Sequence, residues 1–286
     1  MEVGLRDHPS AQSGVRELHR RQRLRSSETG RRRLRALIGT ASVFTVLFVW
    51  WLATEGLGWV GPLSLPGPVS VAERIARMTN QPYLGHSLWG HAWQSIQVVM
   101  LGWIIAGVLG APAGILMAWS RRFRDLTYPA FQALRPISPI AWIPLAITWL
   151  GIGDSARIFI VFIAAVVPWV LNAMEAVYSI DPNLVRASKN LGSGDLGTLC
   201  RVVIPAGLPT LLGGARIALG NAWTAVIAAE LLAATAGLGF IALNASRTLD
   251  STTTVAAMVV IGVLGLLFSV IMRRVVRFIA PWASVI

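Results

Sequence analysis

The sequence predicts an all-α integral membrane protein with six transmembrane helices. Three observations predict this fold class: 55% of the 286 residues are hydrophobic, only 13% are charged, and the uncharged residues form long runs. A soluble domain usually carries about 25% charged residues, and a soluble core of this length could not hide so much apolar material. The composition therefore excludes a disordered chain and disfavours a soluble enzyme.

Six runs have the length and composition of a membrane-spanning helix. A bilayer core about 30 Å thick requires roughly 20 helical residues, and an open strand cannot satisfy its backbone groups in lipid. The six candidates are residues 36–54, 92–118, 136–153, 158–174, 208–234 and 251–272. Of these, only 208–234 contains charged residues, namely Arg216 and Glu230.

The net charge of +12 follows the predicted membrane topology. Residues 1–35 contain ten arginines, and we interpret them as a mobile cytoplasmic tail, with a transit peptide as the alternative. With six spans, this tail, the loops 119–128 and 179–205 and the C-terminus share one side, which holds 19 of the 25 basic residues. Basic residues mark the cytoplasmic side, so we expect both termini in the cytoplasm and no nucleic-acid partner.

Residues 55–90 form the predicted outer loop, which precedes the core of the predicted membrane domain at 91–280. The run Leu65-Pro-Gly-Pro68 breaks the chain, and Ser70 with Glu73 fits a capping box at the start of a new helix. This helix is predicted to be amphipathic and to lie on the membrane surface, either packed there or docking a partner. Its apolar face comprises Val71, Ile75 and Met78.

The region 119–150 contains four prolines. Proline removes a backbone donor and kinks a helix. So many prolines near one span predict a bent helix that faces protein or a cavity rather than lipid.

The large cytoplasmic loop, residues 181–205, has the pattern of a helical hairpin. Asp181 and Pro182 fit the N-cap and first positions of a helix, and Gly192 fits the position just after its end. A second short helix, about 194–203, leads to Pro205. The apolar stripe of the first helix would require a partner to cover it. This stripe comprises Leu184, Ala187 with Ser188, and Leu191.

One face of the fifth span carries both of its ionisable residues. Arg216 and Glu230 lie about 21 Å apart along the helix axis, so they cannot pair with each other. Ionisable residues inside a span usually face a pathway or the bundle interior. We interpret this face as the lining of a translocation path, with structural pairing to other spans as the alternative. The path residues are Arg216, Gly220, Trp223 and Glu230.

Sequence signals for a catalytic or nucleotide-binding site are absent. The chain has no Gly-Lys-Ser/Thr, so it lacks a Walker A loop. The run Gly237-Leu-Gly239-Phe-Ile-Ala242 has the outline of a dinucleotide fingerprint but follows a membrane span, which favours an ordinary glycine-rich loop. His86 and His91 flank the start of the second span and are expected at the membrane interface, without a metal.

Several motifs resemble a known transporter family. Arg186-Ala-Ser-Lys-Asn-Leu-Gly192 followed by Val202-Val-Ile-Pro205 resembles the EAA loop of binding-protein-dependent ABC importer permeases, Glu-Ala-Ala-x3-Gly-x9-Ile-x-Leu-Pro. Arg186 replaces the glutamate of that motif and Ser188 an alanine, whereas Ala187, Gly192 and Pro205 are kept. Residues 134–145 with 149–153, and 213–223 with Glu230, are similar to the nitrate, sulfonate, taurine and bicarbonate branch.

The resemblance implies a type I importer permease in the bacterial inner membrane. It implies a dimer with a second permease copy, a dimeric cytoplasmic ATPase that uses ATP and Mg²⁺, and an extracytoplasmic binding protein. The chain itself would bind no cofactor and catalyse no reaction, and its substrate would be a small anion such as a sulfonate, taurine or nitrate. The residues expected to contact the ATPase are Leu184, Arg186, Ala187, Ser188, Leu191, Gly192 and Pro205.

Two other function classes remain as alternatives. A secondary transporter of small anions, driven by an ion gradient, would carry internal repeats with broken helices in matching positions, and the two halves show no clear self-similarity. A membrane enzyme or DNA-linked sensor would use the Arg-rich tail, which is also suited to anionic lipid.

Overall fold

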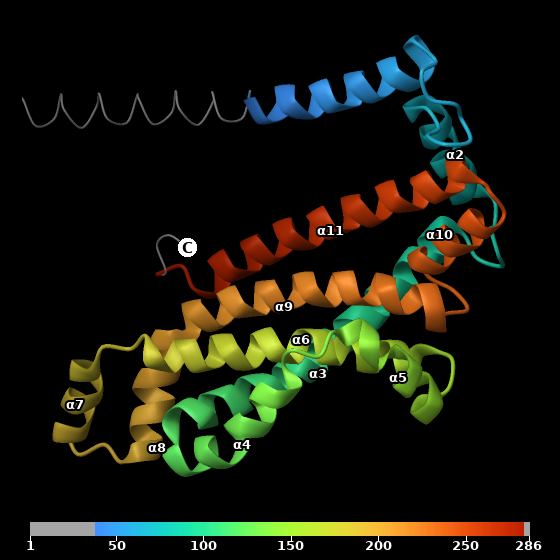
Figure 1. Cartoon of the computed structure of the whole chain (residues 1–286). Coiled ribbons are helices and arrows are strands. Elements are labelled where there is room, and N and C mark those ends of the chain that lie inside the picture. The colour runs from blue at the N-terminus through green and yellow to red at the C-terminus, as the bar shows by residue number, and fades with distance from the viewer. Residues whose placement is uncertain (1–37, 283–286) are drawn as a thin grey trace, which may run out of the picture. The chain divides into compact units, whose positions relative to one another are not determined.

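The computed structural model describes residues 38–282, and every regular element in that range is a helix (Figure 1). The Arg-rich tail lies outside the described residues, as do the first two residues of the predicted span 36–54. The described chain divides into two units at Gly61. The first contains the helix Ile38–Gly56, which ends in a π-helical turn from Leu52 to Gly56 and is long and apolar enough to cross a membrane.

The second unit is a helical bundle with short helices at both ends (Figure 1). Four of its helices could each cross a membrane: α3 (Leu88–Trp119), α6 (Asp154–Tyr178), α9 (Ile204–Ala233) and α11 (Ser251–Ile279). The helices α4 (Arg121–Leu134), α7 (Pro182–Asn190) and α8 (Asp195–Thr198) lie at one end, and α2 (Pro68–Asn80), α5 (Ile143–Leu150) and α10 (Leu238–Arg247) lie at the other.

The predicted third span, residues 136–153, is not a single helix. A 3-10 turn, Pro139–Trp142, leads into α5, and this pair meets α4 at 88°. The cause is local: Ser138 precedes Pro139 and has a non-helical ψ of 135°, because a residue before proline disfavours the α conformation. The described residues thus hold five candidate spans, or six if the bent pair crosses as one.

Helix α6 lies at the centre of the bundle, in contact with α3, α5 and α9. Close packing of α3 on α6 depends on small residues, as is common between membrane helices. A Cβ atom on Gly114 would overlap the carbonyl oxygen of Val170. Trp103 of α3 also donates a hydrogen bond to the Ala215 carbonyl of α9 (3.0 Å). The polar network described below takes its side chains from these same three helices.

The outer amphipathic helix exists as α2, but its predicted capping box is wrong. The helix begins at Pro68 with Gly67 as N-cap, because proline is preorganised for the first helical position. Ser70 thus lies inside the first turn, where its hydroxyl donates to the Gly67 carbonyl (2.8 Å). Glu73 instead pairs with Arg77 (3.3 Å).

The apolar face of α2 is packed into the bundle: Val71 and Met78 are buried. Arg74 of this helix donates to the Thr253 hydroxyl (2.6 Å) and pairs with Asp250 (3.3 Å), the N-cap residue of α11. These contacts fasten α2 to α11.

The N-cap of α11 yields a stability prediction. The Asp250 carboxylate accepts from the Thr253 amide (3.0 Å), so Asp250→Ala is expected to cost about 1 kcal/mol. Asp250→Asn keeps a good cap but loses the charge beside Arg74. Partial burial raises the pKa of Asp250, but the Thr253 hydrogen bonds and the Arg74 charge outweigh it and lower the pKa overall. This depressed pKa contributes stability above the ordinary aspartate value and loses it as pH falls through the folded value.

The measurement is thermal unfolding of the purified protein in detergent at several pH values. We expect the melting temperature of the wild type to exceed that of the Asn variant at pH 7, and the difference to shrink progressively as the pH falls below about 4. A difference that persisted unchanged to pH 3 would show that the Asp250 charge does not stabilise this junction.

Candidate functional site

The hairpin predicted at residues 181–205 forms as expected at its first helix. The Asp181 carboxylate accepts from the Asn183 amide (2.8 Å), and Pro182 begins α7. At the other end, Gly192 adopts a left-handed φ of 82° that a side chain would strain. The Gly192 and Ser193 amides donate to carbonyls of the last turn (2.9 and 3.1 Å), which makes a Schellman C-cap.

The second arm of the hairpin differs from the prediction. The predicted helix 194–203 is present as α8 and a π-helical turn, but it continues without a break into α9, so that Asp195–Ala233 is one long helix. Two contacts tie the arms together: the Ser188 and Thr198 hydroxyls lie 3.1 Å apart, and Lys189 pairs with Asp195 (2.8 Å). The hairpin is therefore joined rigidly to a membrane-spanning helix.

The tip of the hairpin exposes apolar side chains. Leu184 is 50% exposed, Leu191 is 88% exposed and Leu196 is 76% exposed. The other predicted coupling residues also lie on this hairpin, apart from Pro205, which is in the first turn of α9. Of these, Arg186, Ala187, Gly192 and Pro205 are exposed and Ser188 is half-buried. Leu196 of the second arm was not among the predicted residues, because the motif places no apolar position there.

Three of the four predicted path residues line one cavity. Arg216, Gly220 and Trp223 of α9 face a cavity of about 190 Å³, whose other wall is α11 with Phe268 and Ser269. Trp223 and Phe268 pack edge to face, with ring centroids 5.0 Å apart. Arg216 is exposed, so the cavity combines an aromatic wall with one positive charge.

Glu230 does not line this cavity. It is 1% exposed and belongs to a buried polar network at the opposite end of α9. Its Oε1 accepts from the Ser95 hydroxyl of α3 (2.5 Å), and its Oε2 accepts from the Gly239 amide of α10 (2.8 Å). The Nη1 atom of Arg157, on α6, lies 3.7 Å from the Oε1 atom of Glu230. Glu230 thus pairs with other helices, the arrangement that the sequence left as the alternative.

The network satisfies three consecutive amides at the start of α10. The Gly237 amide donates to His91 Nδ1 (3.1 Å), the Leu238 amide to the Ser95 hydroxyl (3.0 Å), and the Gly239 amide to Glu230. These are among the donors that a helix N-terminus leaves free. His91 Nε2 lies 2.8 Å from the Tyr83 carbonyl, which can only accept, so the ring is the neutral tautomer protonated at Nε2.

Arg157 closes the network from α6. It is 1% exposed, and its Nη1 donates to the Ala236 carbonyl (2.9 Å) while its Nη2 pairs with Asp154 Oδ1. Gly237 is required here for two reasons: its φ is 126°, and a Cβ atom would overlap the carboxyl carbon of Glu230. The glycine-rich loop therefore contacts the carboxylate of Glu230, a residue of the same chain.

Sequence reasoning missed most of this network. It expected His91 at the membrane interface and gave it no partner, whereas the side chain is fully buried inside the bundle. Two signals were available: His91 and Ser95 are four residues apart and share a helix face, and Asp154 and Arg157 are charged residues at the start of a span. Among residues 38–282, no group of three His, Cys, Asp or Glu side chains is placed to hold a metal ion.

Comparison with known proteins assigns the family. Residues 110–285 match the family of binding-protein-dependent transport system inner membrane components. The chain belongs to this family. The permease is therefore a multi-pass membrane subunit of an ABC importer, as its motifs predicted.

Three relatives of the permease agree with the predicted branch. It is 35% identical to the taurine transport system permease protein TauC of Escherichia coli (strain K12), over 86% of its length and 88% of the relative's. It is 33% identical to the bicarbonate transport system permease protein CmpB of Synechococcus elongatus, over 86% and 88%. It is 31% identical to the putative aliphatic sulfonates transport permease protein SsuC of Escherichia coli (strain K12), over 83% and 88%.

A solved structure confirms the predicted fold class. The permease matches a chain of the inward-facing MetNI methionine ABC transporter with a TM-score of 0.61 and 21% identity, over 66% of its own length and 94% of that chain. The type I importer permease fold is thus shared at low sequence identity.

Proposed function

We propose that this permease forms the pathway of an ATP-driven importer for a small anion, such as a sulfonate, taurine or nitrate. The observation that carries the proposal is the exposed leucine tip of the α7–α8 hairpin, in a chain of this family without a Walker A loop. A separate dimeric ATPase would cover the tip and use ATP and Mg²⁺. The permease itself would be non-catalytic and bind no cofactor. The names of the relatives support the substrate class.

The hairpin would transmit movement of the ATPase as a rigid body. Its arms are tied by Ser188 with Thr198 and by Lys189 with Asp195, and its second arm is continuous with α9. A displacement at the tip would therefore move the cavity that contains Arg216. Such a movement would alternate the pathway between outward-open and inward-open states.

The places where the remaining partners would bind depend on the predicted orientation of the permease. In this orientation the permease lies in a bacterial inner membrane with both termini in the cytoplasm. An aromatic belt supports the outer boundary, because Trp89, Trp93 and Trp149 are exposed at the end of the bundle opposite the hairpin. A binding protein would deliver substrate at that end. A second copy of the permease would complete the pathway, and lipid would surround the dimer.

The test is uptake of labelled taurine, aliphatic sulfonate or nitrate into proteoliposomes that contain the permease, its ATPase and its binding protein. We expect uptake only with ATP and with all three components. Uptake driven by an ion gradient without ATP would overturn the proposal and favour the secondary transporter.

A substitution tests whether Arg216 lines the translocation path. Arg216→Gln removes the positive charge from the cavity, so we expect the KM for the transported anion to rise about tenfold, equivalent to about 1.4 kcal/mol. Binding of the ATPase should not change. Arg247→Gln is the matched control, because Arg247 is exposed on α10 outside this cavity. An unaltered KM in the Arg216 variant would remove the residue from the path.

A further inference from the structure

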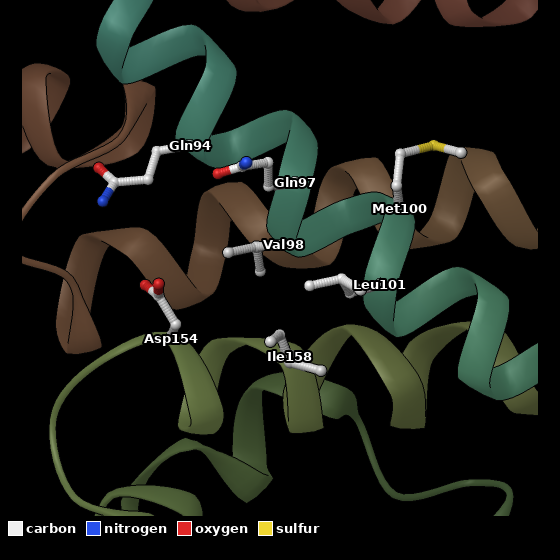
Figure 2. A pocket seen from close by; sticks show the side chains of 7 residues that line it. All are labelled: Gln94, Gln97, Val98, Met100, Leu101, Asp154 and Ile158. Atoms are coloured by element: carbon white, nitrogen blue, oxygen red, sulfur yellow. The ribbon is translucent and has the colours of Figure 1, made fainter.

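A second cavity opens between α3 and α6, near the end of the bundle that is predicted to face outward (Figure 2). Its volume is about 340 Å³, which lies within the range of small-molecule sites. Figure 2 shows the amides of Gln94 and Gln97 on α3 on the same side as the Asp154 carboxylate at the start of α6. Apolar side chains line the rest of the cavity: Val98, Met100, Leu101 and Ile158.

The polar side chains of this cavity would cost free energy if they faced lipid. Polar groups inside a membrane usually face protein or water, and here two amides lie one turn apart on a helix that is otherwise largely apolar. The Gln94 amide oxygen is buried and has no hydrogen-bond partner among the described residues. A buried acceptor without a donor costs free energy. The side-chain oxygens of Gln94, Gln97 and Asp154 belong to residues that line the cavity, so an occupant that donates hydrogen bonds would find acceptors there.

The charge around the cavity selects the kind of donor. Asp154 is 58% exposed, and within residues 38–282 only its Oδ1 is paired, with Arg157. Glu230 and Arg157 are buried and do not line the cavity, so Asp154 is the acidic side chain that faces an occupant. A negative wall attracts an ammonium group and repels a simple anion.

We infer that this cavity is an outer subsite for a small zwitterionic substrate, which places its ammonium group between Gln94, Gln97 and Asp154. A short alkyl chain would lie against Leu101 and Ile158, and the acidic group of the substrate would point away from the carboxylate. This subsite rests on the proposed function and narrows its substrate class from anions in general to amine-bearing acids.

Thiol labelling tests the subsite without transport. Cys200, the single cysteine of the chain, is first replaced by serine. Gln97→Cys is then introduced, and the permease–ATPase complex in lipid nanodiscs is treated with a cationic or an anionic methanethiosulfonate reagent. We expect reaction with both and a ratio of cationic to anionic rates that falls roughly two- to fivefold when Asp154→Asn is added, the range of an exposed ion pair.

Gln132→Cys is the matched control, because Gln132 is exposed on α4, and its rate ratio should not respond to Asp154→Asn. An unreactive Cys at position 97 would mean that lipid or another helix covers the cavity, and it would overturn the subsite. An unchanged rate ratio would do the same.

Ligand protection distinguishes this subsite from the proposed function. Taurine is expected to slow labelling at position 97, whereas ethanesulfonate, which lacks the ammonium group, is not. Gln94→Leu, which leaves the Asp154–Arg157 pair intact, should reduce the protection by taurine. Equal protection by both compounds, or by neither, would overturn the subsite. Loss of ATP-driven uptake of all anions would instead overturn the proposed function, because labelling requires no transport.

Discussion

Replacing Glu230 with alanine is expected to destabilise the permease by about 2–4 kcal/mol, because the buried Ser95 hydroxyl and Gly239 amide both lose their acceptor, at about 1–3 kcal/mol for each unsatisfied group. The substitution leaves Arg157 buried beside an empty space and removes the acceptor of the Gly239 amide. Both losses fall in a part of the bundle that water does not reach, since Glu230 and Arg157 are each 1% exposed. The effect should therefore exceed that of any surface substitution.

The measurement is reversible unfolding in mixed detergent micelles. Glu175→Ala is the control, because Glu175 is exposed near the other end of α6 and should change stability by no more than about 0.5 kcal/mol. Arg157→Leu combined with Glu230→Ala should cost less than the sum of the two single variants, because the pair is then removed together. Strict additivity would show that the two charges do not interact.

Replacing Leu191 with aspartate is expected to abolish co-purification of the ATPase while the permease still folds. Leu191 is 88% exposed, so folding requires nothing from its side chain. In an interface, a carboxylate at this position would have to be desolvated without a partner, and loss of one anchoring residue typically costs 2 kcal/mol or more, about 30-fold in affinity. ATP-driven uptake should fall with the association.

Leu249→Asp provides the matched control for this experiment. Leu249 is 72% exposed at the end of the bundle away from the hairpin, so its replacement should leave ATPase association unchanged. Normal co-purification of the Leu191 variant would contradict the coupling role of the hairpin tip. Loss of association in both variants would indicate general misfolding, which a monodisperse gel-filtration profile would exclude.

Local sequence rules predicted the parts of the fold that depend on neighbours along the chain. The hairpin is an example: Asp181, Pro182 and Gly192 act within a single helix, so their residue types predict its start and its end. The capping box at Ser70 failed for the same kind of reason, because Pro68 is the stronger start signal and lies two residues earlier.

Contacts between distant residues could not be predicted in this way. Ser95 and Glu230 are 135 residues apart in the chain, and His91 and Gly237 are 146 apart. Helical periodicity places Arg216 and Glu230 on one face of α9, but it does not state which neighbour covers each part of that face. The bundle covers Glu230 with α3, α6 and α10 and leaves Arg216 open to a cavity beside α11.

The sequence by itself determined that this protein is a multi-pass helical membrane protein and a permease of an ABC importer. Hydrophobic length, charge distribution and local capping suffice for this, because each acts over at most a few turns of helix. Only the tertiary structure decided that Glu230 stabilises the start of α10, that the proline-rich segment bends by 88°, and that Gln94, Gln97 and Asp154 share one cavity. These features depend on how separate helices pack, and packing brings together side chains that no local pattern relates.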